Sequence, residues 1–314
     1  MAEENQPKWI CGFWRRIGAL IIDSIVLGVT GFLLGLGLSE VFVGLGSWGR
    51  LVGFAIALAY FGILNSNLFD GQTIGKRVLN IRVVDASNNT IPVHRSLGRY
   101  AILGIPFFLN GALFSNEIIM SFWMYVFSLV VFGGLFSIVY LYVFNRVTRQ
   151  SLHDLAVGTY VVNVGAEKLK PGQVWKPHYA VVGILFVVSA LVPIYTSGMV
   201  KQEPFAGLLK SRNELLKNPA VKYAIVSNRY SLVKSADTAT APKHRLIAQI
   251  VLKKNETSNS DLARSLATTL ASNYPNYSEV GITTVGLMYG YDIGIASAWS
   301  QNFYNYQLGE LLIR

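Results

Sequence analysis

The stretch FWRRIGALIIDSIVLGVTGFLLGLGL, residues 13–38, decides the fold class of this chain. Between Ile17 and Leu38 it carries one charged residue, Asp23, and the run is long enough to cross a bilayer as a helix. A carboxylate at the centre of a membrane helix costs about 2.5–3.5 kcal/mol on insertion scales, so it is kept where a partner, water or a passing ion offsets that cost. Asp23 is therefore the first candidate functional residue.

Four further segments are almost free of charge, and they cover residues 51–69, 100–116, 118–144 and 179–200. Each is close to or above the roughly 17–25 residues that span a bilayer. The chain is 52% hydrophobic and 14% charged, whereas soluble domains carry about 25% charged residues. These features predict a polytopic α-helical membrane protein with about five transmembrane helices. Segment 100–116 is short and contains Pro106, so a re-entrant segment stays open as an alternative there.

The distribution of Lys and Arg predicts the orientation. Basic residues gather in 1–16, 70–99 and 145–178, and the intervening loops are poor in them. The positive-inside rule then places the N-terminus in the cytoplasm, and five crossings place residues 201–314 outside. Residues 1–16 lack the apolar core of a cleavable signal peptide, so we expect the first span to remain in a bacterial inner membrane. The net charge of +10 follows from this topology and predicts no nucleic-acid partner.

The polar segments predict small folded parts. Residues 70–92, DGQTIGKRVLNIRVVDASNNTIP, predict a cytoplasmic β-hairpin with Asn88 and Asn89 in its turn and Ile91–Val93 returning. Tyr160–Val164 is a further candidate strand, able to pair with that hairpin. We expect a membrane domain over 1–165, a cytoplasmic linker over 166–178 and a fifth transmembrane helix over 179–200.

The region 201–314 predicts a soluble, extracytoplasmic α+β domain. Its expected helices are Glu203–Lys217 and Ser258–Tyr274, the latter with Ser260 as N-cap. Its expected strands are Val221–Val226, Arg245–Leu252, Glu279–Tyr289 and Ile293–Tyr304, with a turn at Gly290-Tyr291-Asp292 between the last two.

Three motifs occur in order along the first half of the chain: FWRRIGALIID at 13–23, GQTIGKRVLNIRVVD at 71–85 and RQSLHDLAVGT at 149–159. Together they resemble the RDD family of membrane proteins over residues 10–165. The resemblance implies that Arg16, Asp23 and Asp154 are the name-giving positions, with Arg15 as an alternative to Arg16. It also implies a four-helix membrane domain and a role in transport, of which cation/proton exchange is one version. The region beyond residue 179 lies outside the resemblance.

Arg16 is a candidate partner for Asp23. The two are seven residues apart, about 10.5 Å along a helix and on nearly the same face. Burial disfavours a charged carboxylate and a nearby guanidinium favours it, and this balance suits a group that exchanges one cation for another. The functional hypothesis is that Asp23 binds a monovalent cation or a proton and that Arg16 or Asp154 tunes it. The alternative is an intramembrane ion pair that fixes the helix register.

Asp154 and His153 follow the fourth span. Ser151 with Asp154 three residues later has the spacing of a capping box, and a structural role near Arg146 or Arg149 competes with a gate or proton relay through His153. In the cytoplasmic basic loop, Lys76, Arg77 and Arg82 are expected to meet anionic lipid headgroups. That loop lacks the spacing of a phosphate-binding GxxxxGK[ST] motif.

Enzymatic chemistry has no support in the sequence. There is no Ser-His-Asp arrangement, no HExxH, and a single cysteine, Cys11, so we expect neither an enzyme, a cofactor nor a metal site. Two functions remain: a transporter or cation/proton exchange component, or a non-transporting scaffold whose domain at 201–314 binds a protein partner. Membrane lipids are expected contacts in both, and a homo-oligomer is compatible with either.

Overall fold

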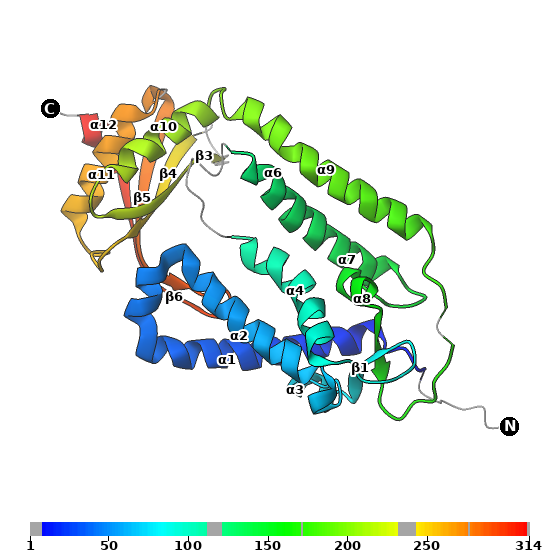
Figure 1. Ribbon diagram of the computed structural model, residues 1–314. Helices are drawn as coiled ribbons and strands as arrows, with labels where there is room; N and C mark the ends of the chain where they lie inside the picture. The colour runs from blue at the N-terminus through cyan, green and yellow to red at the C-terminus, as the bar shows by residue number, and fades with distance from the viewer. Residues whose placement is uncertain (1–7, 112–120, 171, 232–242, 276, 313–314) are drawn as a thin grey trace, which may run out of the picture. The chain divides into compact units, whose positions relative to one another are not determined.

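The computed structural model describes residues 8–111, 121–170, 172–231, 243–275 and 277–312. The chain divides into two compact units. The first comprises Met1–Ile194 together with Asp292–Ser297, and the second comprises Tyr195–Tyr291 with Ala298–Arg314. Figure 1 shows the helices of the first unit and the sheet with its helices in the second.

The first unit begins with a helical hairpin. Helix α1 runs over Phe13–Leu45 with non-helical backbone angles at Leu38, and α2 runs over Gly49–Leu64 after the short 3-10 turn η1 at Gly46–Trp48. Most of the predicted loop at 39–50 is therefore helical, because Phe42 and Val43 continue the apolar pattern and are buried. Gly46, with φ 55°, ends α1 in a conformation that a side chain would disfavour.

The remaining long helices of this unit are also apolar. α4 covers Val93–Leu109, and one continuous helix joins α6 at Trp123–Ser128, the π-helical turn η3 at Leu129–Gly133 and α7 at Gly134–Phe144. α9 covers Pro177–Met199 and lies beside α6 and α7 in Figure 1, where the Ser128 hydroxyl donates to the Ser189 carbonyl. The second part of the predicted span 100–116 lies outside the described residues.

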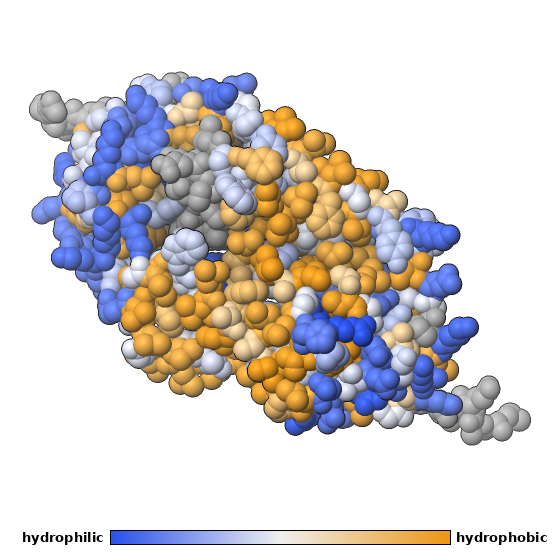
Figure 2. All heavy atoms as spheres, viewed as in Figure 1, coloured by the Kyte–Doolittle hydropathy of each residue, from blue (hydrophilic) through white to orange (hydrophobic). Residues whose placement is uncertain are grey.

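Among the described residues, three stretches are long and apolar enough to cross a membrane: Phe13–Leu64, Trp123–Phe144 and Pro177–Met199. Their outward side chains are apolar, and Ile25, Leu36 and Ile184 are each at least 60% exposed. Figure 2 shows hydrophobic atoms gathered over these helices and hydrophilic atoms gathered near α3 and β1. A continuous apolar surface of this kind is stable against lipid and not against water.

A two-stranded sheet joins distant parts of the first unit. β1, Ile81–Asp85, pairs antiparallel with β2, Thr159–Asn163, so the predicted hairpin within 70–92 is wrong. The Asp85 carboxylate accepts the N–H groups of Ser87 and Asn89 and closes a turn, after which Pro92 caps α4 instead of starting a returning strand. The short helix α3, Ile74–Val78, precedes β1, with the 3-10 turn η2 (Asn67–Phe69) before it, and α8, Leu152–Val157, precedes β2.

The second unit is a four-stranded sheet in the order β3-β4-β5-β6. Its strands are β3 Val221–Ser231, β4 Lys243–Leu252, β5 Val280–Asp292 and β6 Ser297–Gln307. β3 and β4 are antiparallel, and β4 and β5 are parallel with the crossover helix α11 between them in sequence. β5 continues through the predicted turn at 290–292, so the chain reverses after it, at 293–296.

Helices α10, Phe205–Leu216, and α11, Ser260–Asn273, supply apolar residues to the core of the second unit, and η4 (Tyr277–Glu279) and α12 (Leu308–Leu312) complete it. Leu246, Ala248 and Ile250 of β4 alternate inward and are fully buried. The N-cap of α11 is Asn259, whose side chain accepts the N–H of Leu262, and not the predicted Ser260.

Candidate functional site: two buried carboxylates

Asp154 is held at the start of α8 beneath two guanidinium groups. The predicted capping box is confirmed, because the Asp154 side chain accepts the Ser151 N–H and Asp154 lies at the third position of the helix. Arg16 of α1 pairs with its Oδ2 at 2.7 Å, and Arg99 of α4 pairs with its Oδ1 at 2.6 Å. Thr159 of β2 donates to the same Oδ1 at 3.3 Å. One carboxylate therefore ties together two helices of the bundle, α8 and the small sheet.

The cluster around Asp154 is buried. Asp154 is 0% exposed, Arg16 8% and Arg99 6%. The two guanidinium groups hold the pKa of the Asp154 carboxyl well below its usual range, although burial alone would raise it. Arg16 also donates to the Arg149 carbonyl and lies over the Tyr142 ring, with its guanidinium carbon 4.8 Å from the centroid.

Asp23 lies on the same face of α1 as Arg16 but has different partners. Its Oδ1 accepts the Tyr60 hydroxyl of α2 at 2.7 Å and the Gly75 N–H of α3 at 2.8 Å. Its Oδ2 accepts the Thr73 hydroxyl at 2.6 Å. Three donors from outside α1 thus meet a carboxylate that is 0% exposed. Asp23 fastens α1 to α2 and α3.

Gly75 allows the close approach of α3 to α1. A Cβ at this position would lie 2.2 Å from the Ala19 carbonyl oxygen and 3.0 Å from Asp23 Oδ1. No side chain fits that space, because the obstructing atom is backbone. Glycine is therefore required for the Gly75 N–H to reach the carboxylate.

Lys76 is the unexpected member of the site. It was expected at the lipid headgroups, but it is buried, 9% exposed, with Nζ 5.8 Å from the centroid of the Phe61 ring. Nζ also lies 3.4 Å from Thr73 Oγ1, the atom that donates to Asp23. Burial lowers the pKa of Lys76 to about 7, with Arg99 lowering it further and Asp23 opposing. Lys76, Thr73 and Asp23 therefore form a continuous hydrogen-bonded chain.

His153 does not act as a titrating neighbour of Asp154 near neutral pH. Its Nε2 lies 3.6 Å from Asp154 Oδ2, and its Nδ1 is buried without a hydrogen-bond partner among the described residues. Burial lowers the pKa of His153 to about 3, despite the attraction of Asp154. The imidazole is therefore neutral over the physiological range.

The side-chain pairs in the structure differ from those that the sequence predicts. Arg16 pairs with Asp154 and not with Asp23, and the arginines that meet Asp154 are Arg16 and Arg99, not Arg146 or Arg149. Arg15 turns to the other side of α1 and donates to Asn163 Oδ1 at 3.1 Å. Of the basic loop, Arg77 is exposed, as expected for a headgroup contact, and Arg82 is half-buried in β1.

Three members of the site were not anticipated as such: Tyr60, Thr73 and Arg99. Tyr60 lies in an apolar span, where its hydroxyl needs a partner when buried. Thr73 is the N-cap of α3, accepting the Lys76 N–H, and this cap could have been recognised from Thr-Ile-Gly-Lys. Arg99 belongs to the basic segment 70–99 that predicts the orientation, but it is the seventh residue of the apolar helix α4, and a buried arginine requires a partner.

The fold and the site together define a class: a polytopic membrane protein whose helices close around a buried cluster of arginine, lysine and aspartate. The RDD family model matches residues 10–158, just under half of the chain. The match contains α1, both carboxylates and their partners described above except Thr159, which lies just beyond it.

The chain is also similar to a curated protein. The chain is 26% identical over 173 residues to "Uncharacterized protein YxaI" of Bacillus subtilis (strain 168), a match that takes in 48% of this chain and 95% of that protein. No solved structure matches the chain. The region after the RDD domain has no family assigned by these comparisons.

Proposed function

We propose that this chain is a cation/proton exchange component of a bacterial inner membrane. The observation that carries the proposal is the chain of hydrogen bonds from Lys76 through Thr73 to Asp23, buried beside the Arg16–Asp154–Arg99 cluster. It supplies a group that titrates near neutral pH and a carboxylate with oxygen neighbours, joined by a hydroxyl that can relay a proton.

The charges of the cluster support an exchange of one positive charge for another. Arg16 and Arg99 are positive, and the carboxylates of Asp154 and Asp23 are negative. With a neutral Lys76, the buried positive and negative charges of the described site therefore balance. One further positive charge can be a proton on Lys76 or a monovalent cation beside Asp23, and holding both at once would be costly in a low-dielectric interior. Loss of the Lys76 proton to water and arrival of a cation at Asp23 leave the total charge unchanged.

The oxygen atoms around Asp23 are the ligands that a hard cation prefers. They are the two carboxylate oxygens and the hydroxyls of Tyr60 and Thr73, which lie 2.7 and 2.6 Å from the carboxylate. In the described conformation these hydroxyls donate to Asp23. Cation binding requires them to turn their lone pairs inward, and access requires α3 to move away from α1.

The proposal includes an orientation. The N-terminus, α3 and the β1–β2 sheet face the cytoplasm, five crossings lead to the second unit, and that unit lies outside the cytoplasm. The basic residues of 70–99 and 145–178 support it by the positive-inside rule. No catalysed reaction, resident cofactor or metal is part of the proposal.

Reconstituted vesicles provide the test. A pH-sensitive dye inside the vesicles reports proton movement when Na⁺, K⁺ or Li⁺ is added outside. We expect wild-type protein to move protons against one or more of these cations, and Asp23→Asn and Lys76→Met to abolish the movement. Arg77→Gln is the matched control, because it removes a neighbouring exposed charge and should leave the movement intact. Cation-independent dye signals, or full activity of Lys76→Met, would falsify the proposal.

A second candidate function rests on β6. It is an edge strand of the second unit and is exposed along most of its length, with Trp299 39% and Phe303 50% exposed. An exposed edge strand with aromatic side chains is suited to adding a strand from a protein partner. A non-transporting scaffold would bind its partner here. Replacing outward residues of β6 by lysine would then remove partner capture, and vesicles with the wild-type protein would show no cation-driven proton movement.

A further inference from the structure

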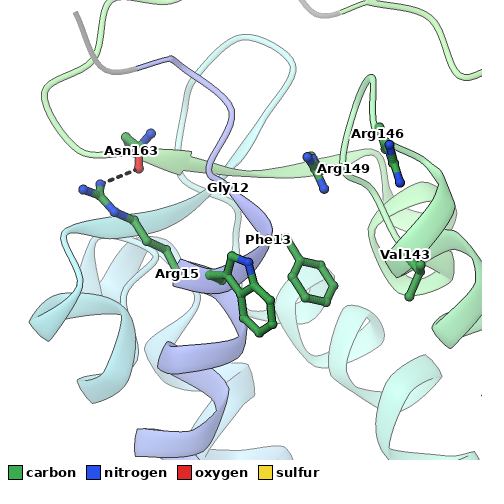
Figure 3. A pocket seen from close by; sticks show the side chains of 8 residues that line it. Gly12, Phe13, Arg15, Val143, Arg146, Arg149 and Asn163 are labelled. Carbon is green, nitrogen blue, oxygen red and sulfur yellow. Dashed lines mark hydrogen bonds between the residues drawn. The ribbon is translucent and has the colours of Figure 1, made fainter. Parts of the chain in front are cut away.

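A cavity of about 600 Å³ opens between the first turn of α1 and the loop that follows α7. Phe13, Trp14 and Arg15 line one side, and Val143, Arg146 and Arg149 line the other. Figure 3 shows Arg146 and Arg149 on the loop that follows α7 and the Phe13 ring at the start of α1. The cavity is separate from the Asp23 and Asp154 sites.

The cavity concentrates positive charge. Among the described residues no carboxylate lies within ion-pair distance of Arg15, Arg146 or Arg149, and the partner of Arg15 is the neutral amide of Asn163. The start of α1 adds to this field, because its N-cap Gly12 supplies no side chain and its first turn contains no acid. Three guanidinium groups and an uncapped helix end therefore favour the binding of an anion in this cavity.

Contacts with the buried Arg16–Asp154 pair position the loop that follows α7. The Arg149 carbonyl accepts a hydrogen bond from Arg16, whose guanidinium is in turn fixed on Asp154. Arg149 itself has φ 54°, a left-handed conformation that turns the chain between α7 and α8. The two walls of the cavity are therefore held at a set separation.

Part of the cavity lining is apolar. Phe13 and Trp14 begin a membrane-type helix and Val143 ends another, and Trp14 is 80% exposed. Aromatic side chains at the ends of membrane helices lie at the level of lipid headgroups. Arginines above and aromatic rings below match a phosphate joined to acyl chains better than they match a free phosphate, which would use the arginines alone.

We propose that this cavity binds the phosphate headgroup of an anionic glycerophospholipid. Three cations without a counter-charge favour a lipid of net negative charge, because the ammonium of a zwitterionic lipid would be repelled. The guanidinium groups hold the phosphate oxygens, and Trp14 with Phe13 packs against the first segments of the acyl chains.

Native mass spectrometry of the full-length protein in detergent tests this. The probes are phosphatidylglycerol, phosphatidylcholine and inorganic phosphate, each titrated separately. We expect wild type to retain phosphatidylglycerol at least about tenfold more tightly than phosphatidylcholine, given the strength of charge-assisted hydrogen bonds. Inorganic phosphate should bind at least about tenfold more weakly than phosphatidylglycerol, since it lacks the acyl contacts.

Two double variants with the same change of net charge separate the cavity from general electrostatics. Arg146→Gln with Arg149→Gln should lower phosphatidylglycerol affinity by about tenfold or more. Lys168→Gln with Lys170→Gln, on the exposed linker, should leave it within about twofold, because charges outside the cavity make only screened contributions. Because Arg149 has an unusual backbone conformation, the exposed Arg146→Glu alone serves as a second variant and should also weaken binding.

Three results would overturn the proposal. They are equal retention of the two lipids, equal losses in the cavity and linker variants, and inorganic phosphate binding as tightly as phosphatidylglycerol. The last result would mean that the cavity binds free phosphate and not a lipid headgroup.

Discussion

At the scale of single residues, the two buried aspartates have different partners and so different sensitivities. Asp23 is met by neutral donors, and Asp154 is met by two guanidinium groups. Loss of the Asp23 carboxylate leaves neutral hydrogen-bond donors without an acceptor. Loss of the Asp154 carboxylate leaves two buried arginines without a counter-charge.

Asp154→Asn should therefore destabilise the protein strongly. Arg16 and Arg99 would share a neutral amide in a buried site, and breaking a buried ion pair from one side costs about 3–5 kcal/mol. Thermal unfolding in detergent measures the effect. Asp70→Asn is the matched control, because Asp70 is exposed and its left-handed φ of 54° suits asparagine. Equal melting temperatures for the two variants would contradict the arrangement described here.

Lys76 predicts a particular pH dependence of stability. Its pKa is lowered from 10.5 to about 7, so between these pH values the unfolded chain binds more protons at this side chain than the folded chain does. The contribution of Lys76 thus makes stability rise as pH increases through that window, and it is constant below about pH 7. Lys76→Met should raise the melting temperature at pH 7 and flatten its rise toward pH 10. The exposed Lys170→Met should leave the profile of wild type unchanged, and an unaltered slope in Lys76→Met would count against a buried Lys76.

At the scale of elements, the approach of α3 to α1 forms the Asp23 site. Gly75→Ala would place a methyl group against the Ala19 carbonyl, displace α3 and withdraw the Gly75 N–H from Asp23. We expect a lower melting temperature by a few degrees or more and loss of cation-dependent proton movement. Gly98→Ala in α4 is the control, because a Cβ there meets nothing within 4 Å and alanine favours a helix. Similar behaviour of both alanine variants would argue against close packing of α3 on α1.

Local sequence patterns predicted elements better than partners. The Ser151–Asp154 capping box is a contact over three residues, and its spacing was sufficient to predict it. The pairing of β1 with β2 joins segments more than 70 residues apart, and no local signal distinguishes it from a hairpin within 70–92. Arg16 and Asp23 share a face of α1, yet α8 and α3 bring their partners from elsewhere in the chain. Helical spacing alone could not predict which carboxylate Arg16 would meet.

At the scale of the whole molecule, the RDD family model matches residues 10–158, and the topology of the chain stays a prediction. With Cys11 replaced by serine, a cysteine introduced at exposed Thr268 should react with a membrane-impermeant maleimide added to intact cells after outer-membrane permeabilisation. A cysteine at exposed Lys168 should react only after lysis. The reverse pattern would mean that the second unit is cytoplasmic and that the number of crossings is even.

The charge pattern predicts an orientation, but composition left the second unit without an assigned role. Its apolar alternation predicted an α+β fold, and a fold of this kind carries no function by itself. The candidate ion site was predicted through one residue, Asp23, and its titrating partner was missed because Lys76 resembles an orienting surface charge until burial is seen.

The most direct test of the account is proton release on cation binding. Purified protein in weakly buffered detergent at pH 7 is mixed with Na⁺, K⁺ or Li⁺, and the released protons are counted with a pH dye. The account predicts about half a proton released per chain with at least one of these cations, because one positive charge replaces another and Lys76, with a pKa of about 7, is about half protonated at pH 7. Release should be absent in Lys76→Met and Asp23→Asn and intact in Arg77→Gln. If no cation releases protons from the wild-type protein, or if Lys76→Met releases them equally, the exchange at Asp23 and Lys76 does not occur.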